Sequence, residues 1–140
     1  MNWKKILIAF IVVYIVGMIY NYLVHGMLLA GSYQALDSVW RPQADMQKLM
    51  WVNFITGTFI SFFLVYIFVK GYEGRGIMEG VRYGIVMWAF VSIPMSFGQY
   101  MVYPLPYSLI WKWLISDLII FVITGVILAL IYKPLEVANK

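Results

Sequence analysis

Two ionisable side chains, Asp117 and His25, lie inside long apolar stretches of the sequence and are its strongest candidates for a functional site. A charged group at membrane depth costs free energy, and such groups commonly mark a binding site, a proton relay or a buried ion pair. A histidine beside a carboxylate suits proton transfer near neutral pH. The pair therefore predicts where a site lies, but it does not identify a reaction.

Further polar and aromatic residues lie at a similar depth in the apolar stretches. Asn21 and His25 are four residues apart, so they share one face of a helix. The complete predicted ligand-binding set is Asp117, His25, Asn21, Asn53, Gln99, Tyr103 and Trp113. Because these residues fall in the outer third of their stretches, they predict a shallow, polar-lined pocket for an apolar or amphiphilic ligand.

Four apolar stretches carry these residues, and each is long enough to cross a bilayer as a helix, which needs roughly 20 residues. They cover about 6–29, 49–69, 77–103 and 109–132, with an outer loop over 30–48. A chain of 140 residues that is 64% hydrophobic and 11% charged is unlike a soluble domain. We expect an all-α, four-transmembrane-helix bundle that forms a single membrane domain over 1–140.

The basic residues predict the orientation of this bundle in the membrane. An even number of helices places both termini on one side, together with the turn near residue 73. That side carries Lys4, Lys5, Lys70, Arg75, Arg82, Lys133 and Lys140, and the opposite side carries Arg41, Lys48 and Lys112. Since cytoplasmic loops are enriched in Lys and Arg, both termini are expected in the cytoplasm. The net charge of +4 reflects this bias and gives no support for nucleic-acid binding.

Small residues predict where helix backbones approach one another. The expected packing positions are Gly17, Gly57, Ser61, Gly125 and Ala129. In one alternative, Gly125 and Ala129 face the lipid and pack against another subunit. A weak internal match between 21–25 and 99–103 also suggests two parallel helical hairpins.

The glycine-rich turn over 71–76 predicts a flexible hairpin between antiparallel helices. Glu79 and Arg82 lie three residues apart at the start of the next stretch. We expect these two side chains to form an ion pair at the membrane surface, near Arg75 or Glu73.

Enzymatic motifs and complete metal-ligand sets are missing from the sequence. With no cysteine, thiolate chemistry and Cys-ligated metals are excluded. His25 is the only histidine, so a haem would need single-His ligation or sharing between chains, and a zinc site lacks ligands. No Gly-x-Ser-x-Gly or His-Glu-x-x-His motif is present, and we expect no enzyme. The sequence requires no cofactor, and a haem or a quinone are the alternatives that stay open.

The expected activity is therefore non-catalytic binding of an apolar or amphiphilic ligand, or of a partner helix, in the outer half of the bundle. One alternative is a small oligomeric transporter or proton-coupled carrier that uses Asp117 and His25. Another is an accessory subunit of a larger membrane complex. In a purely structural alternative, Asp117 pairs with Lys112 or Arg41 and fastens the outer loop. The expected partners are membrane lipids, further copies of the chain or other membrane subunits.

Several short segments also carry a resemblance to known sequences. They are His25-Gly26-Met27-Leu28-Leu29, Val39-Trp40-Arg41-Pro42, Arg82-Tyr83-Gly84, the run from Val102 to Tyr107, and Trp113. Together they resemble a group of small bacterial four-helix membrane proteins of unknown function. The resemblance implies the four-helix topology and a bacterial inner membrane, and it assigns no chemical role to any residue.

Overall fold

Four long helices make up most of the protein. The structure, a computed structural model, describes residues 2–132; Lys133 and Lys140, which contribute to the predicted orientation, lie outside the described residues. The long helices are α1 (Trp3–Asn21), α4 (Met50–Gly71), α5 (Ile77–Val102) and α6 (Tyr107–Ile131). With the extension of α1 to Leu28, each is long and apolar enough to cross a membrane. The prediction of an all-α protein with four membrane-spanning helices is confirmed, and the chain is a multi-pass membrane protein.

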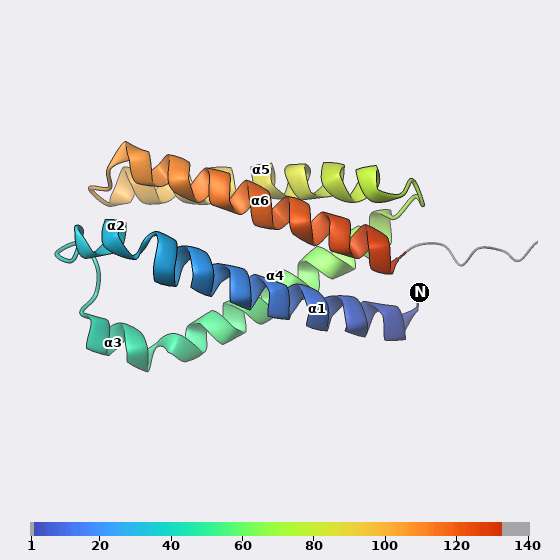
Figure 1. Cartoon of the computed structure of the whole chain (residues 1–140), viewed down its shortest axis with the longest axis horizontal. Coiled ribbons are helices and arrows are strands. Elements are labelled where there is room, and N and C mark those ends of the chain that lie inside the picture. The colour runs from blue at the N-terminus through green and yellow to red at the C-terminus, as the bar shows by residue number, and fades with distance from the viewer. Residues whose placement is uncertain (1, 133–140) are drawn as a thin grey trace, which may run out of the picture.

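Successive long helices run in opposite directions, so the molecule has two distinct ends (Figure 1). One end carries the connections over 29–49 and 103–106, and we call it the long-loop end. Two short helices, α2 (Ala30–Gln34) and α3 (Gln43–Lys48), lie within the longer of these connections. The opposite end carries residue 2, the turn over 72–76 and residue 132, and we call it the terminal end.

Helices α5 and α6 form the closest pair in the molecule. A Cβ atom placed on Gly80 would lie 2.1 Å from the carbonyl oxygen of Gly125, and one on Gly84 would lie 2.4 Å from that of Phe121. Only glycine allows two helix backbones to approach this closely. Gly125 and Ala129 are both buried in the molecule. The alternative in which these two residues face the lipid is therefore wrong.

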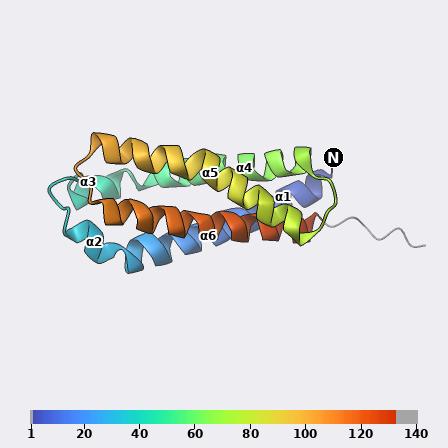
Figure 2. The ribbon, with the colours of Figure 1, turned by 90° about the horizontal axis from the view of Figure 1, so that it is seen from above.

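Helices α1 and α4 form a looser pair. A Cβ atom on Gly57 would reach the ring of Tyr14 at 3.4 Å, and one on Gly17 would have nothing within 4 Å. Helix α4 crosses the bundle obliquely, so its long-loop half is largely exposed and its buried residues begin at Ser61. Helix α1 also lies along α6, and this contact joins the two pairs (Figure 2).

Apolar packing is divided between the two ends of the bundle. The cluster at the terminal end contains Ile6, Ala9, Val13, Val65, Phe68, Leu128 and Ala129. The cluster at the long-loop end contains Val24, Leu29, Leu105, Leu109, Ile110, Trp113 and Leu114. The first cluster is wholly aliphatic and aromatic, whereas the second includes the indole of Trp113, which can donate a hydrogen bond. A buried hydrogen-bond donor therefore lies within the apolar cluster of the long-loop end.

The first span changes helix type before it ends. Residues Tyr22–Leu28 form a π-helical segment, η1, in which the N–H of Leu29 donates to the carbonyl of Val24 at 2.8 Å. Such segments are rare and often occur at functional sites. His25 lies in the middle of η1, so the wider turn sets the direction of its ring.

Candidate functional site

Five aromatic and histidine side chains gather at the long-loop end, and we call them the aromatic cap: His25, Tyr33, Trp40, Tyr103 and Trp113. The Nδ1 atom of His25 lies 2.5 Å from the hydroxyl oxygen of Tyr33, and the indole N–H of Trp113 donates to the same oxygen at 2.8 Å. Trp40 lies edge-on to Tyr33 and next to Tyr103, with ring centroids 6.0 and 6.4 Å apart respectively. The cap thus fastens the long connection to η1, to α6 and, through Tyr103, to the connection that follows α5.

Tyr33 is the central hydrogen-bonding group of the cap. Burial raises the pKa of its hydroxyl; the bond from Trp113 acts in the opposite direction and the negative charge of Asp117 adds to the rise. The phenol therefore keeps its proton at neutral pH. A phenol that accepts one hydrogen bond can still donate its own proton. Tyr33 can accept from Trp113 while it donates to His25.

Asp117 lies one helical turn along α6 from Trp113 and is half-buried. The Ser92 side chain of α5 and the ring of His25 lie close enough to influence its carboxylate. A carboxylate at this depth needs such partners because few water molecules reach it. Asp117 therefore connects α5, α6 and the histidine of the aromatic cap.

The purely structural alternative for Asp117 is wrong in its choice of partner. Among residues 2–132, no ion pair joins Asp117 to Lys112 or Arg41. Lys112 instead donates to the hydroxyl of Ser32 in α2, at 3.1 Å. The long connection is fastened by that contact and by the aromatic cap.

Some of the predicted ligand-binding residues lie elsewhere. Asn21 ends α1 and Asn53 lies in the first turn of α4, and both side chains are exposed. Gln99 is half-buried, and its backbone carbonyl accepts from the N–H of Tyr103. The structure brings together His25, Trp113 and Asp117, with Tyr103 at the edge of the same group.

The sequence-based set also omits residues that belong to this end of the bundle. The hydroxyl of Tyr20 donates to the Ser116 carbonyl at 2.8 Å and lies 3.1 Å from its Oγ atom, which joins α1 to α6. Lys112 is also missing from that set. It could have been found from the sequence, because a single cation between Trp111 and Trp113 indicates the start of a span at the membrane interface. Tyr33 suits the membrane interface by its type, but nothing in the sequence pairs it with Trp113 or His25.

A groove opens between η1 and α6, and His25 is not among its lining residues. Its volume is about 410 Å³, and its lining consists of Tyr20, Val24, Leu28, Leu29, Lys112, Ile115, Ser116 and Ile119. Apolar side chains form most of its walls. Lys112 contributes a positive charge, and Tyr20 and Ser116 contribute hydroxyl groups. The groove thus combines an apolar channel with a small polar region.

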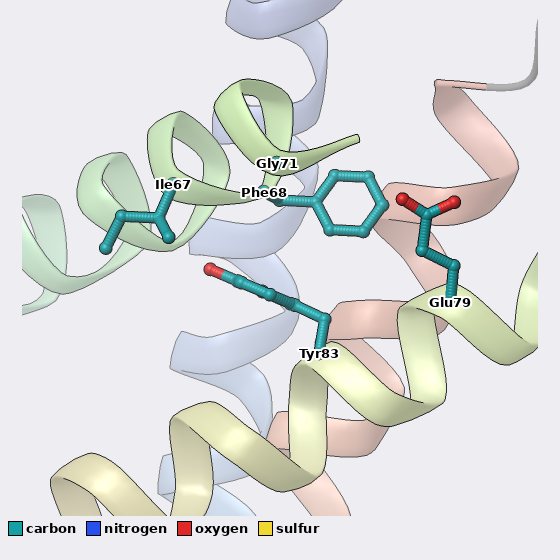
Figure 3. A pocket seen from close by; sticks show the side chains of 5 residues that line it. All are labelled: Ile67, Phe68, Gly71, Glu79 and Tyr83. Carbon is teal, nitrogen blue, oxygen red and sulfur yellow. The ribbon is translucent and has the colours of Figure 1, made fainter. Parts of the chain in front are cut away.

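A smaller pocket lies between α4 and α5 at the terminal end. Its volume is about 150 Å³, and Figure 3 shows its lining: Ile67, Phe68, Gly71, Glu79 and Tyr83. Small-molecule sites usually have volumes of roughly 300–1,000 Å³. The hydroxyl of Tyr83 donates to the Leu64 carbonyl at 2.5 Å, so this group already has a partner. This pocket is a weaker candidate than the groove.

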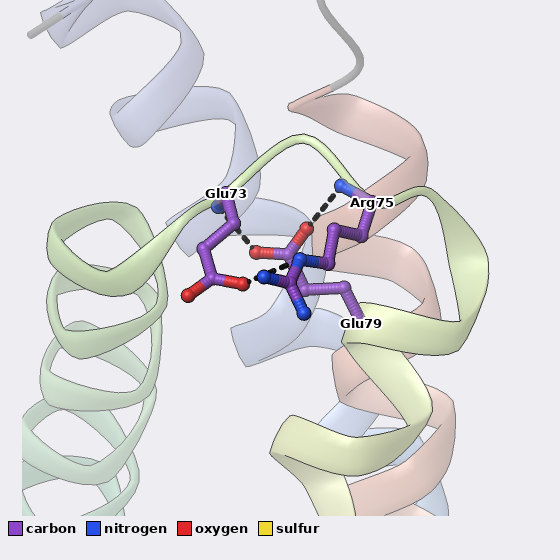
Figure 4. A network of polar contacts seen from close by, with 3 residues as sticks. All are labelled: Glu73, Arg75 and Glu79. Carbon is purple, nitrogen blue, oxygen red and sulfur yellow. Dashed lines mark hydrogen bonds and ion pairs between the residues drawn. The ribbon is translucent and has the colours of Figure 1, made fainter.

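The carboxylate of Glu79 fastens the glycine-rich turn beside this pocket (Figure 4). It accepts hydrogen bonds from the backbone N–H groups of Glu73 and Arg75, at 2.6 and 2.7 Å. The Nε atom of Arg75 lies 2.7 Å from Glu73, and this contact is the ion pair of the turn. The expected ion pair between Glu79 and Arg82 is therefore wrong, because the backbone of the turn is the partner of Glu79.

The capacity of the site for a metal or cofactor rests on His25. Within residues 2–132, no three acidic or histidine side chains gather as a metal-ligand group. Because Nδ1 of His25 faces Tyr33, its Nε2 atom is the nitrogen left for a single-His haem. A quinone would need the groove instead.

Comparison with protein-family models, curated proteins and solved structures finds no match for this chain. The four long apolar helices define it as a small four-span membrane protein. Its resemblance to a bacterial group stays a prediction.

Proposed function

We propose that this membrane protein binds an amphiphile in the groove between η1 and α6 and performs no catalysis. The observation that carries the proposal is the groove itself, whose volume of about 410 Å³ falls in the usual range for small-molecule sites. Its apolar walls suit a hydrocarbon chain, and Lys112 and Ser116 suit a polar head group.

The depth of the groove supports an elongated ligand. Tyr107 and Trp111 are exposed in the first turns of α6, where aromatic residues suit the membrane interface. Lys112 lies beside them, and Ile119 is seven residues further along, or about 10 Å deeper at the rise of an α-helix. A ligand with its head near Lys112 and its tail near Ile119 would lie along the membrane normal. The predicted orientation places this ligand in the outer leaflet.

A transporter that uses Asp117 and His25 has less support. A conduit would need polar groups beyond Ser61 toward Lys70. Leu64, Val65 and Phe68 occupy that part of α4 and are buried. The close contact of α5 with α6 also leaves no space between those two helices in the terminal half.

Native mass spectrometry of the full chain, extracted in mild detergent, tests the proposal. We expect a mass adduct from a bound amphiphile, and an absorption spectrum would identify a haem or a quinone. Ile115→Trp should remove most of the adduct because the indole would fill the groove. Ile123→Trp is the matched control, since Ile123 is also exposed on α6 but lies outside the groove lining.

Two outcomes would contradict amphiphile binding. One is an adduct that Ile115→Trp and Ile123→Trp leave equally intact. The other is a wild-type protein that carries no adduct directly after extraction. The same spectra report the oligomeric state, and a constant larger assembly without any adduct would favour the accessory-subunit alternative.

A further inference from the structure

We infer that the ligand of the groove is an anionic amphiphile, whose phosphate or carboxylate head contacts Lys112 and Ser32. The inference rests on the proposed function and specifies the ligand class of the same site. It depends on the charge at the mouth of the groove, on the donors that meet there and on the apolar walls below.

Lys112 brings a positive charge that no carboxylate balances. Among residues 2–132, no Asp or Glu lies within ion-pair distance of its Nζ atom. Lys48, on the same end of the molecule, differs because it pairs with Asp45 at 3.4 Å. Asp117 follows Lys112 by five residues, which turns it about 140° around α6. Neither Asp117 nor its neighbour Ser92 of α5 lines the groove.

Two hydrogen-bond donors meet where Lys112, which lines the groove, contacts Ser32 of α2. The Nζ atom of Lys112 lies 3.1 Å from the Oγ atom of Ser32. An ammonium group has three protons and uses one of them here, and a hydroxyl that accepts one bond can donate another. An anionic head between α2 and α6 could therefore accept from both side chains. A zwitterionic head would bring its own cation close to Lys112 and lose part of this attraction.

The walls below Lys112 require a ligand with a tail. Leu28 and Ile115 are exposed and line the groove together with Ile119. A soluble anion would contact the mouth and leave these side chains without a partner from the ligand. An alkyl chain packs favourably against them through van der Waals contacts, which are the main apolar attraction within a bilayer. The combination of cation and apolar channel thus favours an anionic amphiphile over a free anion.

Lipid retention in bilayers of known composition tests the inference. The full chain is reconstituted in nanodiscs of dioleoylphosphatidylcholine and dioleoylphosphatidylglycerol in equal parts, and retained lipids are counted by native mass spectrometry. We expect a preference for phosphatidylglycerol of about fivefold, as one basic residue at a charged membrane surface would produce. Lys112→Gln should abolish the preference, whereas Lys112→Arg should retain it. Lys48→Gln is the matched control and should leave it unchanged.

Two further additions distinguish the sources of the anion. Oleate, added to discs of phosphatidylcholine alone, should be retained by wild type and not by Lys112→Gln. Inorganic phosphate should not displace phosphatidylglycerol, and displacement would overturn the role of the tail. Equal retention of both phospholipids by wild type would overturn the inference. If the two phospholipids were retained equally and Ile115→Trp still removed lipid, amphiphile binding in the groove would survive without the preference for an anion. If Ile115→Trp removed no lipid either, the proposed function and this inference would both fail.

Discussion

The two antiparallel helix pairs of this protein are built on different contacts. In the α5–α6 pair, Gly80 and Gly125 bring two backbones together so closely that neither position has space for a methyl group. In the α1–α4 pair, Gly57 meets only the ring of Tyr14, at ordinary contact distance, and Gly17 meets nothing. One pair is a rigid backbone contact, and the other is a looser side-chain contact.

The candidate site is divided between the rigid pair and the looser pair. Helix α6 belongs to the rigid pair and supplies Lys112, Trp113 and Asp117. Helix α1 and its extension η1 belong to the looser pair and supply His25 and Leu28. A ligand in the groove would therefore contact one fixed wall and one wall that can adapt, an arrangement that suits an amphiphile with a flexible chain.

The largest effect should come from a change within the rigid pair. Gly125→Ala places a methyl group 2.0 Å from the carbonyl oxygen of Gly80, so the helices must separate. We expect the free energy of unfolding to fall by about 3 kcal/mol, the upper part of the usual range for overpacking. Chemical denaturation in detergent micelles, followed by circular dichroism, measures this change. Gly57→Ala is the control, and an equal loss there would remove the distinction between the two pairs.

A smaller effect should come from the contact that joins the looser pair to the rigid pair. Tyr33→Phe removes the hydroxyl shared by His25 and Trp113 and leaves both rings without that partner. We expect a loss of about 2 kcal/mol, since an unsatisfied buried polar group costs roughly 1–3 kcal/mol. The same denaturation experiment applies, with Tyr22→Phe as control because Tyr22 is exposed. Wild-type stability in Tyr33→Phe would show that the aromatic cap does not hold the pairs together.

The same tyrosine predicts a pH dependence of stability. Burial raises the pKa of Tyr33 above its ordinary value of 10.0. The folded state therefore holds this proton more tightly than the unfolded state, which loses it near pH 10. The contribution to stability is constant below pH 10 and is lost as pH rises toward the raised pKa. Tyr33→Phe should lose less stability than wild type over this alkaline window. Parallel pH profiles of the two proteins would contradict the raised pKa.

A still smaller effect should appear as coupling between Asp117 and His25, which come from opposite pairs. The two groups lie close enough to influence each other, and no ion pair joins them. In a double-mutant cycle of Asp117→Asn and His25→Gln, we expect a coupling energy of about 1 kcal/mol. Unfolding in micelles and ligand retention should both be measured for the four proteins. If Asp117→Asn alters neither quantity, Asp117 is not a functional centre.

The smallest effect should come from the turn that connects the two pairs. Glu79→Gln keeps one acceptor oxygen for the backbone N–H groups of Glu73 and Arg75 and loses the other. Because these bonds are exposed, we expect a loss of about 0.5 kcal/mol, together with faster amide exchange in the turn. Arg82→Gln is the control, since Arg82 is exposed on the same helix. Equal exchange rates in both variants would show that Glu79 does not fasten the turn.

The four spans could be predicted from sequence because length and hydropathy are sufficient for a helix that must satisfy its own backbone in lipid. Their pairing could not be predicted in the same way. The long helices are apolar on nearly every face, so no amphipathic stripe indicates which face meets which neighbour. Gly125 and Ala129 signalled a close approach, but their spacing contains no information about the partner.

The site was predictable in its location and only partly in its members. Asp117 and His25 were visible because charged and titratable groups are rare in apolar stretches. The contacts of Tyr33 and Ser32 with α6 were hidden, because each spans a sequence separation of 80 residues. The change of helix type at Tyr22 was hidden as well, since no residue there forbids a regular α-helix.

The π-helical segment separates the length of the chain from the direction of its side chains. An α-helix turns about 100° per residue, and a π turn holds more residues than an α turn, so each residue of η1 turns by less. Deletion of one residue within Tyr22–Leu28 would let α1 continue as a regular helix. Later side chains would keep nearly the same direction, because the wider turn already absorbs the extra residue. Deletion of one residue in the regular part of α1 would instead rotate His25 away from Tyr33 and Leu28 away from the groove together, by about 100°. Both contacts thus depend on the length of α1 and tolerate a shorter η1.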